Sequence, residues 1–202
     1  MIGLMFILKD EVKVDEYVLK VLEYIQNNSS LNGVVNKMLL DGELYSHSVN
    51  VSRLATQLAL SCNLDDATIF NISLSGLLHD IGKINIDKSI LYKPAKLTEE
   101  EFEIIKKHPL DGSEIVKNCG VATEVTTLIL NHHETHDGSG YPNHITNKTL
   151  EEDLITIADI YSALTESRVY HKQLSIYEAF IKIQDFKDLN KGLVNMLQDV
   201  IE

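Results

Sequence analysis

Six of the eight histidines lie beside acids, other histidines or turn residues, and these short motifs are the part of the sequence that could do chemistry. Glu43 and His47 stand at i and i+4, so on a helix both side chains would leave one face about one turn apart. That spacing suits joint coordination of a metal ion, and a surface acid–histidine pair is the alternative. His79 and Asp80 end an apolar run, where a buried charge needs a partner or a metal.

Two further motifs add imidazoles. Pro109 is expected to force His108 out of helical geometry and to begin the next helix, so that the imidazole projects from a corner. His132 and His133 end an apolar segment, and on a helix they would diverge by about 100° and reach different metal ions. The residues that follow, 134–142, contain turn-forming glycines and a proline, a density of ligand and turn residues that indicates a functional loop.

Asp159 lies inside an apolar helical stripe and therefore also needs a partner, which could be a metal ion or a capping or ion-pairing group. Lys83 and Arg168 offer a point charge and a guanidinium fork to a phosphate. The nominated metal ligands are His47, His79, Asp80, His108, His132, His133 and Asp159, with Glu43 as an eighth. Such a set exceeds one four-coordinate structural zinc and fits two or three divalent ions that share bridging groups.

The elements that must position these residues are predicted to be helices. Only 3 Pro, 10 Gly and no Trp leave few helix breakers. Apolar stripes predict helices over 12–25 and 43–60, Asp65 or Asp66 caps one through Leu78, and 121–131 is a short buried helix. Capping boxes are expected at Thr98 with Glu101, Thr149 with Glu152 and Ser175 with Glu178. The chain is predicted to be all-α, with roughly seven to nine helices and a loop over 136–147.

Composition excludes several classes of protein. A formal net charge of −12 argues against binding a nucleic-acid polymer, whose affinity depends on Lys and Arg. The longest apolar stretch, 4–8, is far too short to span a bilayer. Two cysteines make no disulfide framework. These features predict a reduced, cytoplasmic protein without a membrane segment, in which an anionic ligand needs a local source of positive charge.

In this order, the motifs resemble the HD-GYP subgroup of the HD-domain metal-dependent phosphohydrolases. The resemblance covers about 41–175 and rests on HDIGK at 79–83, His108-Pro109, HHETHDGSGYP at 132–142 and ADIYSALTESRVY at 158–170. It implies an all-α HD-domain helical bundle with a multinuclear site of two or three divalent ions, iron or manganese. It further implies phosphodiesterase activity on cyclic di-GMP giving pGpG and then GMP, whereas some members act on related cyclic dinucleotides.

By position, the resemblance assigns the seven nominated ligands to the metals and Glu43 to the extra carboxylate of members with three ions. It implies that Lys83 and Arg168 contact the phosphate, and that Asp41, Tyr141 and His171 belong to the substrate site. Our hypothesis is in-line attack by a metal-bridging hydroxide, with Asp80 bridging the ions and Lys83 as a further catalytic residue. Candidates for the proton donor to the leaving oxygen are Lys83, His171 and a metal-bound water.

The chain departs from the family at Ser162, where an acid is usual, at Val169, where Pro is usual, and at His171, where Lys or Arg is usual. These departures keep open a non-catalytic module that binds cyclic di-GMP or docks a diguanylate cyclase through the GYP loop. A phosphohydrolase that acts on mononucleotides and a purely structural metal site are also compatible with the motifs. Residues 1–40 are predicted to form a helical cap or a homodimer contact, too short for a sensory domain, and 41–202 the catalytic domain.

Overall fold

The computed structural model describes residues 11–166 and 173–201, and over these residues the chain is all-α, as predicted. The first half contains α1 (Glu11–Asn27), α2 (Ser29–Leu39), α3 (Gly42–Ser61), α4 (Asp66–Leu78), the 3-10 helix η1 (Ile81–Asn85) and α5 (Lys88–Leu91). The second half contains α6 (Glu99–Ile105), α7 (His108–Asn118), α8 (Thr123–Asn131), α9 (Leu150–Thr165), α10 (Ile176–Gln184) and α11 (Lys191–Ile201).

The predicted helix starts are confirmed at the level of individual hydrogen bonds. Asp65 caps α4 by accepting from the backbone N–H groups of Ala67 and Thr68. All three capping boxes are present, at the starts of α6, α9 and α10. The described residues hold eleven α-helices rather than seven to nine. One cause is Asn28, whose side chain accepts from Leu31 N and so starts α2 directly after α1.

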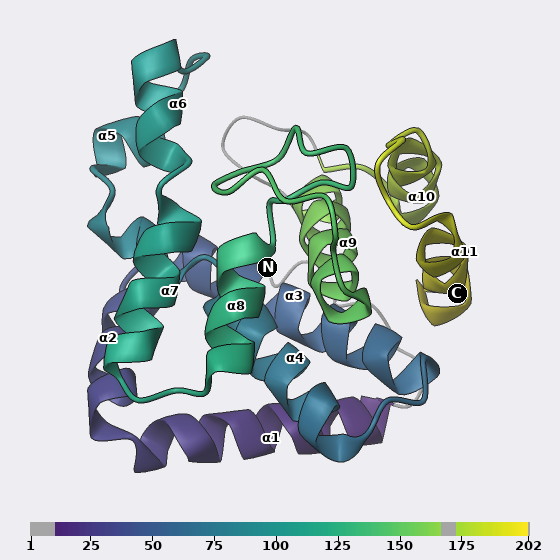
Figure 1. Cartoon of the computed structure of the whole chain (residues 1–202), viewed down its shortest axis with the longest axis horizontal. Helices are drawn as coiled ribbons and strands as arrows, with labels where there is room; N and C mark the ends of the chain where they lie inside the picture. The colour runs from purple at the N-terminus through teal and green to yellow at the C-terminus, as the bar shows by residue number, and fades with distance from the viewer. Residues whose placement is uncertain (1–10, 167–172, 202) are drawn as a thin grey trace.

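Two apolar clusters hold the helices together. The larger one joins α3 and α9 to α10 and α11, with Tyr161 as its largest fully buried side chain. The smaller one joins α2 to α4, α7 and α8. Helix α1 contributes to both, because Val14 and Tyr17 face the first cluster and Val21 and Ile25 face the second. Figure 1 shows α1 along the lower edge, α10 and α11 on the right, and α5 and α6 projecting at the upper left.

Two consequences bear on the predictions. No helix among the described residues is long and apolar enough to cross a membrane. The packing of α1 against α3 and α4 makes the predicted N-terminal segment continuous with the rest of the helical bundle. The division of the chain at residue 40 stays a prediction.

Candidate metal centre

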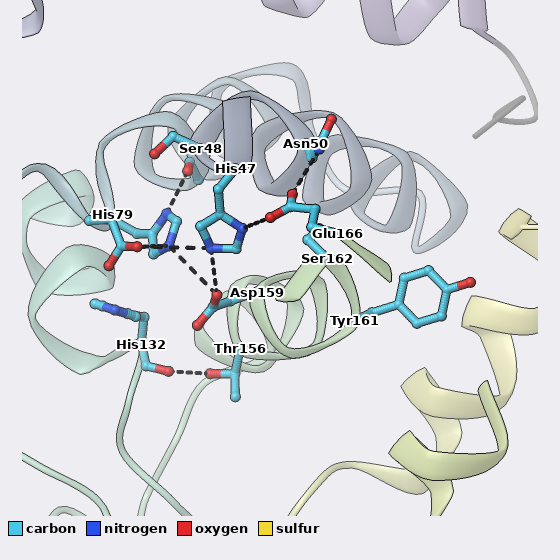
Figure 2. Close-up of polar contacts among 12 residues, drawn as sticks. His47, Ser48, Asn50, His79, His132, Thr156, Asp159, Tyr161, Ser162 and Glu166 are labelled. Carbon is cyan, nitrogen blue, oxygen red and sulfur yellow. Dashed lines mark hydrogen bonds and ion pairs between the residues drawn. The ribbon is translucent and has the colours of Figure 1, made fainter. Parts of the chain in front are cut away.

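Five segments far apart in the sequence bring buried imidazoles and carboxylates to one place. His47 comes from the N-terminal third of α3, and His79 and Asp80 directly follow α4. His108 begins α7, His132 and His133 follow α8, and Asp159 comes from α9. Figure 2 shows His47, His79, His132 and Asp159 pointing toward one another. His79, His108 and His132 are fully buried, and Asp80 is 1% exposed.

The ligand atoms form three overlapping groups, each with its atoms within 4.8 Å of one another. The groups are Asp80 with His108, His132 and His133; His47 with His79 and Asp80; and His79 with His132 and Asp159. All seven ligands nominated from the sequence are therefore in the cluster. Asp80, His79 and His132 each belong to two of the groups.

Three of the histidine rings make the same local hydrogen bond to the main chain. The ring Nδ1 of His79 lies 2.8 Å from the carbonyl oxygen of Gly76, three residues earlier. His108 and His132 repeat this contact with Ile105 and Ile129, at 2.7 and 2.6 Å. Because a carbonyl oxygen can only accept, Nδ1 carries the proton in each ring, and the Nε2 lone pair faces the cluster.

The cluster has buried acceptors that no protein donor satisfies. Nε2 of His79 and Oδ1 of Asp80 have no hydrogen-bond partner among the described residues. Nε2 of His108 lies 3.2 Å from Nε2 of His132, although both nitrogens carry lone pairs. Unsatisfied buried acceptors are costly, and cations bound by the overlapping groups would satisfy them.

The charge states also suit metal binding. Burial lowers the pKa of His133 to about 3, and burial also lowers the pKa of His108 and of His132, so these rings are neutral. Burial works against ionisation of Asp80, but its electrostatic interactions with His79 and Lys83 hold its pKa well below the ordinary value. Neutral imidazoles with ionised carboxylates are the forms that bind borderline divalent ions, so the residues fit such a group.

His47 differs from the other histidines in its partners. Its Nε2 lies 2.9 Å from Asp159 Oδ1, and its Nδ1 lies 2.9 Å from Glu166 Oε2. Burial opposes protonation, but the hydrogen bonds to these two carboxylates outweigh it and raise the pKa of His47 to about 9. Glu166 was not nominated from the sequence, although it lies inside the motif at 158–170.

A family model described as the HD domain matches residues 33–190. The chain belongs to the HD domain family. Among curated proteins, it is 35% identical over 176 residues to the cyclic di-GMP phosphodiesterase PA4108 of Pseudomonas aeruginosa, covering 86% of this chain and 42% of that protein. It is also 35% identical over 136 residues to the 3'3'-cGAMP-specific phosphodiesterase 1 of Vibrio cholerae, covering 66% and 32%.

The resemblance of this HD domain to HD-GYP proteins is thereby confirmed. The chain spans less than half the length of either curated relative. Among solved structures, Bd1817, an HDG"Y"P protein from Bdellovibrio bacteriovorus, aligns with a TM-score of 0.63 at 24% identity. The alignment covers 77% of this chain and 51% of that one, and it supports the helical HD fold.

Two expectations about histidines in this HD domain are wrong. His108 is the first residue of α7 rather than a corner outside it, because the N–H that Pro109 lacks would have no partner in the first turn anyway. His132 and His133 do not diverge to separate groups. Both belong to the group that contains Asp80 and His108, and their ring centroids lie 4.1 Å apart.

Glu43 lies apart from the cluster. Its side chain is exposed in the first turn of α3, where a negative charge is favourable, and it belongs to none of the three groups. The expected pairing with His47 is wrong, because the His47 ring turns instead toward Asp159 and Glu166 on the α9 side.

The predicted substrate residues differ in their position relative to the cluster. Nζ of Lys83 lies 2.6 Å from Asp80 Oδ2, and its side chain is 18% exposed. Tyr141 packs on His133 with ring centroids 4.8 Å apart. Asp41 caps α3 and accepts from the Tyr92 hydroxyl at 2.5 Å, so its carboxylate has structural partners. Arg168, Val169 and His171 lie outside the described residues.

Gly82 has a steric role at the edge of the site. It lies in η1, and a Cβ there would come 2.1 Å from the His108 carbonyl oxygen and 2.7 Å from Gly112 N. The glycine of HDIGK therefore permits η1 to pack directly on α7 and brings His108 next to Asp80. The sequence alone indicates only a sharp turn at this glycine.

A buried lysine behind His132 was also missed. The Lys148 side chain is 1% exposed, and its Nζ donates to Thr156 Oγ1 at 2.7 Å and lies 3.5 Å from Asp153. Thr156 in turn donates to the His132 carbonyl at 2.8 Å (Figure 2). These contacts connect the turn that carries His132 to the first half of α9. In the sequence, Lys148 stands among polar loop residues, and nothing there indicated burial.

Proposed function

We propose that this chain is a metal-dependent phosphodiesterase that hydrolyses cyclic di-GMP to pGpG, GMP or both. The observation that carries the proposal is the convergence of five histidines and two carboxylates, in which Nε2 of His79 and Oδ1 of Asp80 are buried without a hydrogen-bond partner among the described residues. The names of the curated relatives, which include enzymes acting on cyclic di-GMP and on 3'3'-cGAMP, support a cyclic dinucleotide as the substrate.

The seven clustered residues would hold two or three divalent ions, and their imidazole and carboxylate donors suit iron or manganese. When bound, such ions lower the pKa of a bound water and take up charge on the phosphoryl oxygens. They would also supply the local positive charge that a chain of net charge −12 needs in order to bind a dinucleotide.

The protein side chains have separate tasks. Lys83 keeps Asp80 ionised through its 2.6 Å contact, and its partly exposed ammonium would contact a phosphate oxygen at the entrance. Arg168 is proposed as a second phosphate contact. Tyr141, packed on His133, would line the substrate site. Lys83 and His171 are the side chains proposed to give a proton to the leaving 3′-oxygen.

The proposal is tested with anaerobically purified protein loaded with Mn²⁺ or Fe²⁺. Chromatography would follow cleavage of cyclic di-GMP and 3'3'-cGAMP, together with mononucleotides as alternative substrates. Asp80→Ala and His79→Ala should lose bound metal and turnover together, whereas Glu103→Ala, on the exposed face of α6, should keep both. Full turnover in Asp80→Ala would contradict the proposal. Tight binding of cyclic di-GMP by the loaded protein without product would favour the non-catalytic binding module.

The remaining partner assignments are part of the same proposal. We place the protein in the cytoplasm, where cyclic dinucleotides are signals. A diguanylate cyclase is a proposed partner of the loop around Gly140 and Tyr141. Homodimer formation through residues 1–40 is proposed from the sequence alone, and sedimentation of the purified chain tests it.

A further inference from the structure

We infer that Glu166 is a positioning residue of the metal centre: it orients His47 and makes this ring a stronger metal ligand. The inference concerns a residue outside the ligand set, and it rests on the metal centre that the proposed function requires.

The geometry at His47 carries the inference. Glu166 Oε2 lies 2.9 Å from Nδ1 of His47, on the side of the ring opposite to the cluster. Nε2 on the other side faces Asp159 at 2.9 Å and Asp80 at 3.8 Å. A carboxylate that accepts from one nitrogen of a ligating imidazole fixes its tautomer, holds its orientation and raises its basicity.

Glu166 is itself held in place. Its other oxygen, Oε1, accepts from Asn50 Nδ2 at 2.8 Å, and Asn50 lies on α3 just beyond His47 (Figure 2). The Glu166 side chain is only 17% exposed. Both ends of the carboxylate are therefore anchored to α3, although Glu166 belongs to the end of α9.

The other histidines do not share this arrangement. His79, His108 and His132 each direct Nδ1 to a neutral carbonyl oxygen three residues earlier. His47 is the sixth residue of α3, where the preceding carbonyl groups are used by the helix, so its Nδ1 needs a partner from another element. The acid usual at the position of Ser162 is absent here, and Glu166, the C-cap residue of α9, lies four residues later.

The test measures metal binding apart from turnover. Metal-free wild type, Glu166→Ala, Glu166→Gln and the control Glu103→Gln would be titrated with Co²⁺ against a competing chelator, with the visible absorption spectrum recorded. We expect Glu166→Ala to weaken Co²⁺ binding about 10–100-fold and to change the spectrum. Glu166→Gln should lose less, because its amide oxygen can still accept from Nδ1. Glu103→Gln, whose carboxylate pairs only with Lys106 in the described contacts, should match wild type.

The outcomes separate this inference from the proposed function. Wild-type affinity and spectrum in Glu166→Ala would overturn the inference. If Glu166→Ala does not fold, Glu166→Gln provides the test. A Glu166→Gln variant with the Co²⁺ affinity and the spectrum of wild type would then overturn the inference. A wild-type chain that binds no Co²⁺ also overturns it, since Glu166 would then orient no ligand. A chain that binds Co²⁺ with the expected pattern but cleaves no cyclic dinucleotide would contradict the proposed function alone.

Discussion

Nε2 of His108 and Nε2 of His132 lie 3.2 Å apart and face each other with lone pairs. Each ring donates its Nδ1–H in a hydrogen bond to a main-chain carbonyl oxygen, of Ile105 and Ile129 respectively. Two acceptors at this distance repel unless a cation or a proton lies between them, and burial lowers the pKa of both rings. The fold therefore builds a buried site whose most favourable occupant is a metal ion.

Metal ions should stabilise the fold strongly. The acceptors at His79, His108 and His132 are formed only when five segments come together, so an ion binds the native state far better than the unfolded chain. At one hundred times its dissociation constant, an ion adds about 2.7 kcal/mol, which for a chain of this size raises Tm by about 5–10 °C. Differential scanning fluorimetry with Mn²⁺ and with a chelator checks this, and an unchanged Tm with every divalent ion tried would contradict it.

The metal-free chain should be most stable near neutral pH. The pKa of His133 is lowered to about 3, and that of His132 is also lowered, so the stability from keeping these rings neutral is lost as pH falls below about 6.5. The pKa of His47 is raised to about 9, so its contribution is complete below about 6.5 and is lost as pH rises through 9.

Urea unfolding between pH 5 and 9 measures this profile. Each group changes the free energy of unfolding by about 1.4 kcal/mol per pH unit in its window, so the acid side should be steeper. Saturating Mn²⁺ should remove the alkaline decline, because His47 is then bound without its proton. A profile independent of pH in the metal-free chain would show that these rings are not buried as described.

Gly82→Ala should damage both stability and the metal site. The new methyl group would lie 2.1 Å from the His108 carbonyl oxygen, so η1 and α7 must separate. We expect a loss of at least about 3 kcal/mol, since backbone cannot move aside as a side chain can. Gly33→Ala is the control: it lies in α2 with no atom within 4 Å of the new Cβ, and it should stabilise by about 0.5–1 kcal/mol. Equal unfolding free energies for the two variants would refute the steric role.

Lys148→Met should destabilise the chain by about 2–4 kcal/mol, because it leaves the buried Asp153 carboxylate without its buried cation. Lys106→Met removes a surface ion pair with Glu103 and should cost less than about 1 kcal/mol. Urea midpoints of the two variants provide the comparison. Equal midpoints would mean that the buried Lys148 ammonium contributes no more than a surface charge does.

The sequence by itself determined the helices and the ligand types. Capping boxes and apolar stripes depend on residues within one or two turns, so α4, α6, α9 and α10 began where expected. The seven residues nominated as ligands stood out because histidines and acids occur there beside, or inside, apolar runs. Local pattern also predicted a Glu43–His47 pair, which the ring of His47 does not form.

Only the tertiary structure decided which groups meet. Glu166 reaches His47 across 119 residues, and Lys148 reaches His132 through Thr156 on a different element. The 2.1 Å clearance at Gly82 likewise depends on how η1 packs on α7. Burial and long-range contacts arise when helices pack, so the spacing of residues along the sequence does not predict them. Sequence patterns therefore nominated the seven residues, whereas packing decided their hydrogen-bond partners and brought them to one place.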